Sequence, residues 1–111
     1  MTGVQTCALP ISKRVEATYE VPYLAHACME PMNCTARVTD EGCDVWCGTQ
    51  NPQAAQAAAA KVLGIPPARV KVHVQYLGGG FGRRGEADFV AQAVTAAKAL
   101  NGKPEIGRAH V

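Results

Sequence analysis

Hydrophobic and polar residues alternate along four stretches of the chain, as in strands that bury one face. The predicted strands are Arg14–Val21, Cys34–Val38, Cys43–Gly48 and Val70–Leu77. Pro22 ends the first strand, because proline removes an N–H from the ladder of a sheet. The polar residues 40–42, which end in a glycine, predict a hairpin between the second strand and the third.

Two helices are predicted, one on each side of the last strand. Asn51 and Pro52 favour a helix start, since asparagine caps the free N–H groups and proline fits the first turn. This helix is expected over Gln53–Leu63, with Gly64 ending it. Apolar residues at helical spacing predict the second helix between Phe89 and Leu100. The sequence therefore predicts an α+β fold with a mixed sheet and two helices.

The two ends of the chain are related at the level of DNA. Residues 6–11 and 106–111 can be encoded by one DNA stretch and its reverse complement, as expected of a sequencing adapter translated at both ends. We therefore interpret residues 1–12 and 105–111 as adapter-like sequence and exclude them from the fold. Residues 13–104 are then expected to be an internal piece of a longer protein. The alternative is a genuine 111-residue chain with a short apolar N-terminus.

Composition and charge exclude several classes of function. With 48 % hydrophobic and 18 % charged residues, the chain is typical of a globular domain rather than a disordered one. The net charge of +2 is spread along the sequence, which argues against a nucleic-acid partner. No apolar run approaches the roughly 18 residues that a membrane span requires. Arg83 and Arg84 are adjacent and leave room for one local anion site.

The cysteines and the aromatic residues give weaker signals. Cys28, Cys34, Cys43 and Cys47 lack paired C-x-x-C spacing, so a zinc site with His26 is a lesser alternative to cysteines packed as small hydrophobes. Trp46 is expected in the core. His73 falls on the polar side of its strand and is expected to face solvent or a partner.

A glycine loop after the last strand carries the most specific chemistry. The strand pattern runs into four glycines and then directly into the second helix pattern; they are Gly78, Gly79, Gly80 and Gly82. Each ordered glycine costs about 0.5–1 kcal/mol relative to alanine, and a simple connector could use one. The loop N–H groups and the helix N-terminus could therefore hold a phosphate-bearing or pterin-bearing cofactor, with Arg83 or Arg84 nearby.

The residues alone leave two other interpretations of this loop. A Walker loop is excluded, because no Gly-Lys-Ser/Thr follows. A Rossmann-like dinucleotide-binding module would use Gly80, Gly82 and Gly85, although its acidic partner about twenty positions on would be near Glu105, in the adapter-like segment. The third possibility is a glycine turn with a purely structural role.

Three ordered segments carry a family resemblance. They are His-Ala-Cys-Met-Glu-Pro-Met-Asn (26–33), Val-Trp-Cys-Gly-Thr-Gln-Asn-Pro (45–52) and Leu-Gly-Gly-Gly-Phe-Gly-Arg-Arg (77–84). Together they resemble the molybdenum-cofactor-binding large subunit of the xanthine dehydrogenase and aldehyde oxidase family. The Gly-Arg-Arg ending is most similar to the bacterial isoquinoline 1-oxidoreductase beta subunits. The resemblance covers residues 13–104 and implies a partial molybdopterin-binding domain.

The resemblance also implies roles for individual residues. Gln50 matches the glutamine that hydrogen-bonds the apical oxo ligand of molybdenum; its alternative is a polar residue at the helix entry. The backbone of Phe81 and Gly82 matches positions that lie against the molybdenum site and the pterin. The implied cofactor-binding residues are Gln50, Gly79, Gly80, Phe81, Gly82 and Arg83. Glu30 is expected to be structural and not the catalytic base.

The activity implied for the parent is hydroxylation of N-heterocycles or oxidation of aldehydes, with oxygen from water. The implied cofactors are molybdenum with molybdopterin cytosine dinucleotide, and 2Fe-2S clusters in a small iron-sulfur partner subunit. The other implied partners are the remaining domains of the large subunit and a small-molecule substrate. The base glutamate lies beyond this chain in the family, so the chain alone is expected to be inactive. The compartment stays open between the bacterial cytoplasm and the periplasm.

Overall fold

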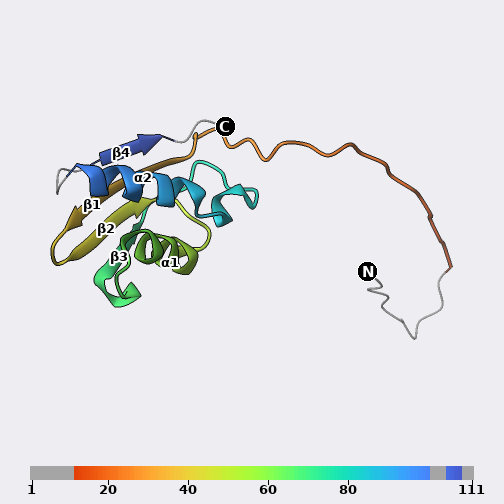
Figure 1. The fold of residues 1–111 in the computed structure, drawn as a ribbon. Coiled ribbons are helices and arrows are strands. Elements are labelled where there is room, and N and C mark those ends of the chain that lie inside the picture. The colour runs from red at the N-terminus through yellow and green to blue at the C-terminus, as the bar shows by residue number, and fades with distance from the viewer. Residues whose placement is uncertain (1–11, 101–104, 109–111) are drawn as a thin grey trace.

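The computed structural model describes residues 12–100 and the backbone of residues 105–108. Its elements are β1 (Asn33–Thr39), β2 (Gly42–Cys47), α1 (Pro52–Leu63), β3 (Val70–Val74), α2 (Asp88–Ala99) and β4 (Glu105–Arg108), with short 3-10 turns at Pro67–Arg69 and Arg83–Gly85. The sheet has the order β3-β2-β1-β4. β1 is antiparallel to β2 and β4, whereas β2 and β3 are parallel. The predicted α+β fold with a mixed sheet is confirmed (Figure 1).

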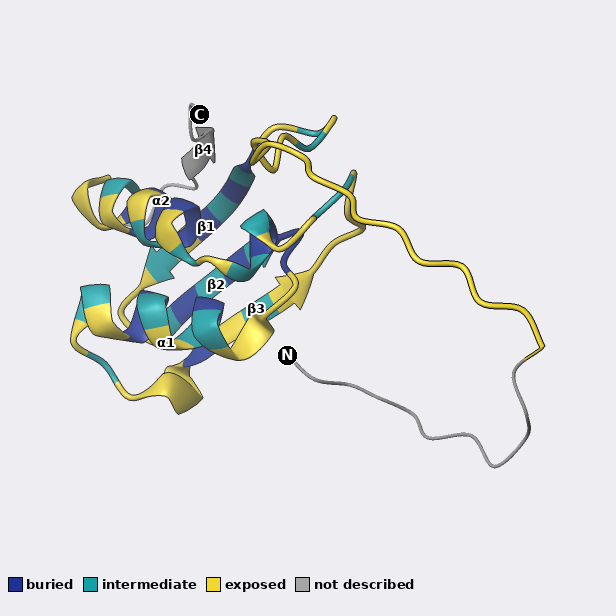
Figure 2. Ribbon diagram, turned by 90° about the vertical axis from the view of Figure 1, so that its right-hand side faces the viewer, coloured by how far each residue is buried: buried dark blue, intermediate teal, exposed yellow. Residues whose placement is uncertain are grey.

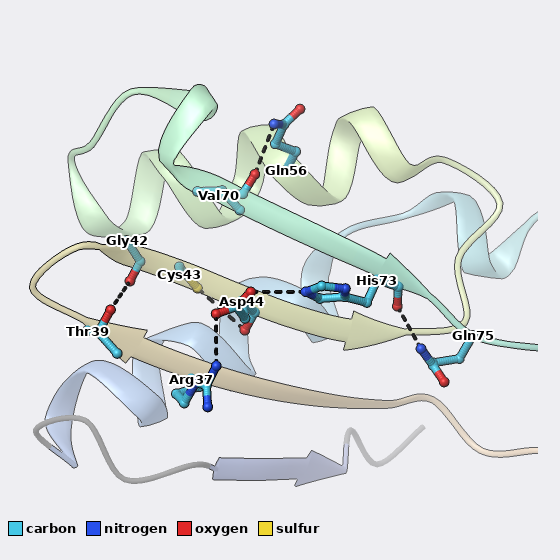
Figure 3. A network of polar contacts seen from close by, with 9 residues as sticks. All are labelled: Arg37, Thr39, Gly42, Cys43, Asp44, Gln56, Val70, His73 and Gln75. Atoms are coloured by element: carbon cyan, nitrogen blue, oxygen red, sulfur yellow. Dashed lines mark hydrogen bonds and ion pairs between the residues drawn. The ribbon is translucent and has the colours of Figure 1, made fainter.

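The parallel pair of strands depends on α1, which connects them. The Oδ1 atom of Asn51 accepts a hydrogen bond from the N–H of Ala54 at 3.1 Å, and Pro52 occupies the first turn. Gly64 ends the helix at φ 67°, in the left-handed region that favours glycine. Gln56 then ties the helix to β3, because its Nε2 donates to the carbonyl of Val70 at 3.1 Å (Figure 3).

The core lies between the sheet and the two helices, which pack against each other on one face of the sheet (Figure 2). Residues of β1 and β2 alternate between buried and less buried positions, as the sequence pattern predicts. The helices bury mainly alanine and valine, together with Phe89. Small side chains allow the helices to approach the sheet closely, so the core is shallow and its area is spread over many residues.

The buried cysteines belong to this core. Cys34, Cys43 and Cys47 are buried free thiols, as expected for small hydrophobic residues. Burial raises the pKa of Cys43 to about 11, which keeps that thiol neutral. Within residues 12–100, no group of three or more metal-binding side chains could hold a metal ion, so the zinc alternative is not supported.

The outer face of the sheet corrects one prediction from the sequence. Trp46 was expected in the core, but Val45 and Cys47 occupy the core face, so Trp46 points to the opposite side. There its ring stacks on His73, with ring centres 5.0 Å apart, and the Arg37 guanidinium lies 5.6 Å above it. Asp44 is hydrogen-bonded to His73 at 3.0 Å and to Arg37 at 3.2 Å (Figure 3). The expected exposure of His73 is confirmed, since 42 % of its side chain is accessible.

Two predicted strands differ from the structure. The strand expected over Val70–Leu77 ends at Val74, because its partner β2 ends at Cys47, and Gln75 makes the last hydrogen bond, to the Cys47 carbonyl at 3.0 Å. The strand expected over Arg14–Val21 is wrong. Residues 13–27 run as an exposed extended segment that pairs with no strand in the described part of the chain (Figures 1 and 2).

The structure describes only part of the segments interpreted as adapter-like. Residues 1–11 and 109–111 lie outside the described residues, whereas Glu105–Arg108 form β4 against β1. Strand pairing uses backbone groups that almost every sequence offers, so the formation of β4 does not test whether this segment is adapter-like. The adapter-like origin of residues 105–111 stays a prediction. No helix among the described residues is long and apolar enough to span a membrane.

The Asp44 contacts give a prediction of how stability depends on pH. Its hydrogen bond with His73, followed by that with Arg37, holds the pKa of the Asp44 carboxyl below its ordinary value of 3.8. A lowered pKa stabilises the fold above pH 3.8, and this stabilisation is lost as the pH falls through the lowered value. We expect Asp44→Asn to reduce the free energy of unfolding at pH 7 and to have little effect near pH 2.

Urea unfolding of both proteins at the two pH values measures this difference. Asp40→Asn, in the exposed turn between β1 and β2, is the control. An equal loss of stability at both pH values would contradict the role given to the ionised Asp44 carboxylate.

Candidate functional site

Three segments that are far apart in the sequence meet around the side chain of Arg84, which is fully buried (0 % exposed). Its Nη1 donates to the carbonyl of Gly48 at 3.2 Å, and its Nη2 donates to the carbonyls of Glu30 and Pro31 at 2.6 and 3.3 Å. Nη2 also forms an ion pair with Oε1 of Glu30 at 2.5 Å. One guanidinium therefore joins the Met-Glu-Pro segment to the end of β2.

The backbone of Arg84 holds the beginning of the next segment. Its carbonyl accepts hydrogen bonds from the N–H of Gln50 and from the hydroxyl of Thr49, both at 3.1 Å. The same hydroxyl accepts from the N–H of Asn51 at 3.0 Å, directly before α1 begins. These bonds fix the backbone of Gln50 between β2 and α1, so its side chain projects from a rigid base.

Glu30 links Arg84 to the glycine loop. Its N–H donates to the Gly78 carbonyl at 3.1 Å, and its Oε1 accepts from the Gly78 N–H at 3.4 Å. A side chain on Gly78 would collide with the Cβ of Glu30, which explains the glycine at this position. Glu30 thus has the structural role that was expected for it.

Gln50 lies directly against the glycine loop. Its Oε1 accepts a hydrogen bond from the N–H of Gly82 at 3.0 Å. A Cβ atom on Gly80 would lie 2.6 Å from that Oε1, so this position excludes any side chain while Gln50 keeps its place. The Nε2 of Gln50 donates to no acceptor within the described residues. The side chain therefore supports the loop with one end and offers a free donor with the other.

The backbone of the loop is held in an uncommon conformation. Gly79 and Gly82 have φ values of 102° and 87°, and Phe81 between them has φ 51°. A left-handed residue with a side chain costs on the order of 1 kcal/mol, and such residues cluster at ligand sites. The Phe81 ring gains little burial in return, since 67 % of the residue is exposed.

This conformation leaves backbone donors available. The N–H groups of Gly79, Gly80 and Phe81 donate to no acceptor among residues 12–100, whereas those of Gly82 and Arg83 are used within the site. Consecutive free N–H groups in a glycine loop form a concave donor surface that suits an anion. Beside the loop, Phe81 and residues 22–27 line an open cavity of about 490 Å³.

Arg83 is placed differently from the other predicted site residues. Its Nη1 and Nη2 bind the two carboxylate oxygens of Asp88 at 2.9 and 2.8 Å, at the start of α2. This pairing lowers the pKa of the Asp88 carboxyl. The structure thus brings Gln50 together with Gly80 and Gly82, whereas the Arg83 guanidinium contacts Asp88 in α2.

The role of Arg84 differs from the one expected from the sequence, where it is one of two arginines near an anion site. The guanidinium contacts Glu30, Pro31 and Gly48 inside the protein. The available signal was the joint presence of the Met-Glu-Pro and Gly-Arg-Arg motifs, which supply the two members of the ion pair. Within the described residues, Nε of Arg84 is the one buried side-chain polar atom without a hydrogen-bond partner.

A comparison with known protein families agrees with this geometry. Residues 5–105 match the molybdopterin cofactor-binding domain family. The chain belongs to this family. The matched region includes the described segments that meet at Arg84, so the loop and Gln50 lie within the family domain.

Relatives of this molybdopterin cofactor-binding domain occur in several oxidoreductases. The chain is 34 % identical over 90 residues to a membrane-bound aldehyde dehydrogenase (pyrroloquinoline-quinone) of Gluconacetobacter polyoxogenes, which covers 81 % of the chain and 12 % of that protein. It is 37 % identical over 73 residues to isoquinoline 1-oxidoreductase subunit beta of Brevundimonas diminuta (65 % of the chain, 9 % of that protein). It is 36 % identical over 104 residues to xanthine dehydrogenase of Oryza sativa (88 % and 8 %). The chain thus spans about a tenth of the length of these relatives.

The Rossmann-like alternative, which would use Gly80, Gly82 and Gly85, is not supported. In a dinucleotide-binding unit, the strand after the helix lies parallel and next to the strand before the glycine loop. Here β3, the strand before the loop, pairs with β2, which precedes it in the chain, and no other strand within the described residues lies next to β3. Residues 5–105 instead match the molybdopterin cofactor-binding domain family. The glycine loop therefore belongs to the molybdopterin cofactor-binding domain and not to a dinucleotide fold.

The contacts of the buried Arg84 side chain predict a large effect of one arginine and a small effect of its neighbour. We expect Arg84→Ala to lower the free energy of unfolding by about 3–5 kcal/mol, because it leaves Glu30 and three carbonyl groups without their donor. Arg83→Ala removes an ion pair with an exposed carboxylate and should cost less than about 1 kcal/mol. Urea unfolding of the three proteins measures both values.

A third variant guards against complete unfolding of Arg84→Ala. Arg84→Lys keeps the positive charge but loses the fork of donors, so it should fall between the other two variants. Equal losses for Arg83→Ala and Arg84→Ala would contradict the central position of Arg84.

The contact between Gly80 and Gln50 predicts a local rearrangement. We expect Gly80→Ala to displace the Gln50 side chain, because the added methyl would otherwise lie 2.6 Å from Oε1. The Gly82 N–H then loses its acceptor, and the chain loses about 1 kcal/mol of stability. NMR shifts of the Gln50 side-chain amide and the Gly82 amide report this change.

Gly85→Ala is the matched control, since a Cβ there meets no atom within 4 Å. Unchanged Gln50 and Gly82 resonances in Gly80→Ala would show that the two segments are not in contact in solution.

Proposed function

We propose that this chain forms part of the molybdopterin seat in the large subunit of a molybdenum hydroxylase. The observation that carries the proposal is the loop over Gly79–Gly82, where free N–H groups lie next to the free Nε2 of Gln50. The residues fit an anionic pterin, because the loop offers donors and carries one side chain, Phe81. The family match supports this identity of the ligand.

Each residue has a defined contribution in this proposal. The N–H groups of Gly79, Gly80 and Phe81 donate to oxygens of the cofactor, and the absence of a Cβ at the glycines permits close approach. Gln50 would help to hold the cofactor through its Nε2 while Oε1 stays bound to Gly82. Its rigid base at the start of α1 keeps that donor in place. Arg83 remains a candidate for contact with the cofactor, for which it would exchange its Asp88 partner.

The reaction proposed for the parent is hydroxylation of an N-heterocycle or oxidation of an aldehyde, with oxygen from water. When bound, the molybdenum cofactor supplies the redox chemistry. The names of the relatives, among them isoquinoline 1-oxidoreductase subunit beta and xanthine dehydrogenase, support this substrate class. The cofactor would be molybdopterin cytosine dinucleotide, and electrons would leave through 2Fe-2S clusters of a small iron-sulfur subunit. The base glutamate would come from the part of the parent beyond this chain.

The test is a pair of glutamine substitutions in the parent enzyme. We expect Gln50→Ala to lower turnover of an aldehyde or N-heterocycle by about 10- to 100-fold, as for other residues that hydrogen-bond the ligands of a bound metal. The matched control is Gln53→Ala, which changes an exposed glutamine in the first turn of α1. Molybdenum content, measured by elemental analysis, separates loss of the metal from loss of turnover.

The two readouts address different parts of the proposal. If the parent enzyme contains no molybdenum after purification from a molybdenum-replete host, the proposed function is wrong. A molybdenum-containing Gln50→Ala enzyme with the turnover of the Gln53→Ala control would reduce Gln50 to a structural residue.

A further inference from the structure

We propose that residues 14–21 form a strand that completes a β-sheet in the part of the parent polypeptide outside this chain. This inference rests on the proposed function only in that it requires the longer parent. We call residues 13–21 the N-terminal arm. The arm extends away from the folded body, whereas the residues after it are fixed to the body by Glu30 (Figures 1 and 2).

The arm exposes several large apolar side chains close together, which is unusual for a protein surface that contacts only water. Val15, Tyr19 and Val21 are 82 %, 87 % and 86 % exposed, and Tyr23 and Leu24 follow with similar exposure. Burying one such side chain contributes about 1.5–3 kcal/mol, so five of them represent a large unused stabilisation. Surfaces of this kind mark contacts with another polypeptide.

The order of side chains in the arm is that of a strand with one buried face. Val15, Ala17, Tyr19 and Val21 alternate with Arg14, Glu16, Thr18 and Glu20. The Nε of Arg14 and the Oε1 of Glu16 form an ion pair at 2.8 Å, which places two alternate residues on the same side of an extended backbone. Valine, tyrosine and threonine also favour strands. The arm therefore has an apolar face and a charged face, as in a strand at the surface of a sheet.

The backbone of the arm lacks the neighbouring strand that its alternating sequence predicts. Its N–H and C=O groups over residues 14–21 take part in no hydrogen bond with the backbone of the described residues. An extended segment with free backbone groups and one apolar face is the form in which a chain adds to the edge of another sheet. The alternation and the missing neighbour are both explained if the neighbouring strand lies elsewhere.

The remainder of the parent is the occupant that fits best. Within the described residues, the arm pairs with no strand of this chain's sheet, neither at its edges nor inside it. The arm enters β1 through the anchored Glu30 segment and leaves the body from there (Figure 2). The matched segments make up 12 %, 9 % and 8 % of three relatives, so each relative is several times longer than this chain and supplies ample polypeptide for a partner sheet. The partner is thus an open sheet edge with an apolar surface next to it.

Amide hydrogen exchange in the purified parent tests the proposal. We expect peptides covering residues 14–21 to exchange at least 100-fold more slowly in the parent than in the isolated 111-residue chain, because each added ladder bond protects an N–H. Exchange in the parent at the rate of the isolated chain would overturn the inference. Protection in the isolated chain that grows with concentration, together with a dimer mass by light scattering, would also overturn it and assign the arm to a second copy.

Paired variants of the parent distinguish the two faces of the arm. Tyr19→Ser with Val21→Ser removes apolar contacts and should lower the melting temperature and abolish the protection of residues 14–21. Thr18→Ser with Glu20→Gln changes the charged face and should leave both unchanged. Equal effects of the two double variants would contradict a strand with one buried face.

The outcome is independent of the test of the proposed function. A parent without molybdenum that still protects residues 14–21 would remove the proposed function and keep this inference. A molybdenum-containing parent with rapid exchange in the arm would do the opposite.

Discussion

The contact between the buried Arg84 guanidinium and Glu30 is the interaction on which the arrangement of the site depends. The Arg84 guanidinium is inaccessible to solvent, and it binds one carboxylate and three carbonyl groups from two distant segments. A buried charge is tolerable only when such partners compensate for the lost water, and here they engage both terminal nitrogens of the guanidinium. The loop and the Met-Glu-Pro segment must therefore fold together. Gln50 is positioned by the same arginine, because the Gln50 N–H donates a hydrogen bond to the Arg84 carbonyl.

The regular elements were largely predictable from local rules. Asn51, Pro52 and Gly64 act within one or two turns of α1, so the sequence placed that helix to within one residue. The hairpin of β1 and β2 follows from alternation around a short polar turn. Strand ends were harder to place, because the length of β3 is set by where β2 stops and not by its own alternating residues. The orientation of Trp46 needed the register of β2, which hydrophobicity alone does not reveal.

The candidate site was predictable only where a residue type is required by backbone geometry. The glycines predict the loop, since Gly79 and Gly82 adopt positive φ values and Gly80 lies too close to Gln50 for a side chain. The proximity of Gln50 to the loop came from the family resemblance, because 30 residues separate Gln50 from Gly80 and no local pattern links them. Charge assignments were the weakest part. Two adjacent arginines cannot be distinguished in a sequence. In the 3-10 turn, the Arg84 side chain is buried, whereas the Arg83 guanidinium binds the carboxylate of Asp88.

The alanine-rich surface of α1 has a consequence for how the site tolerates change. Ala55 and Ala59 are fully buried, and α1 packs against α2 and β3, so the buried face of this helix consists largely of methyl groups. Enlarging either residue would push the helix axis outward, because a close-packed interior has no space to absorb a bigger side chain. Gln50 lies immediately before that helix and would be carried along. Variation in a plain hydrophobic contact, remote from every polar group of the loop, is thus mechanically coupled to the distance between Gln50 and the glycines.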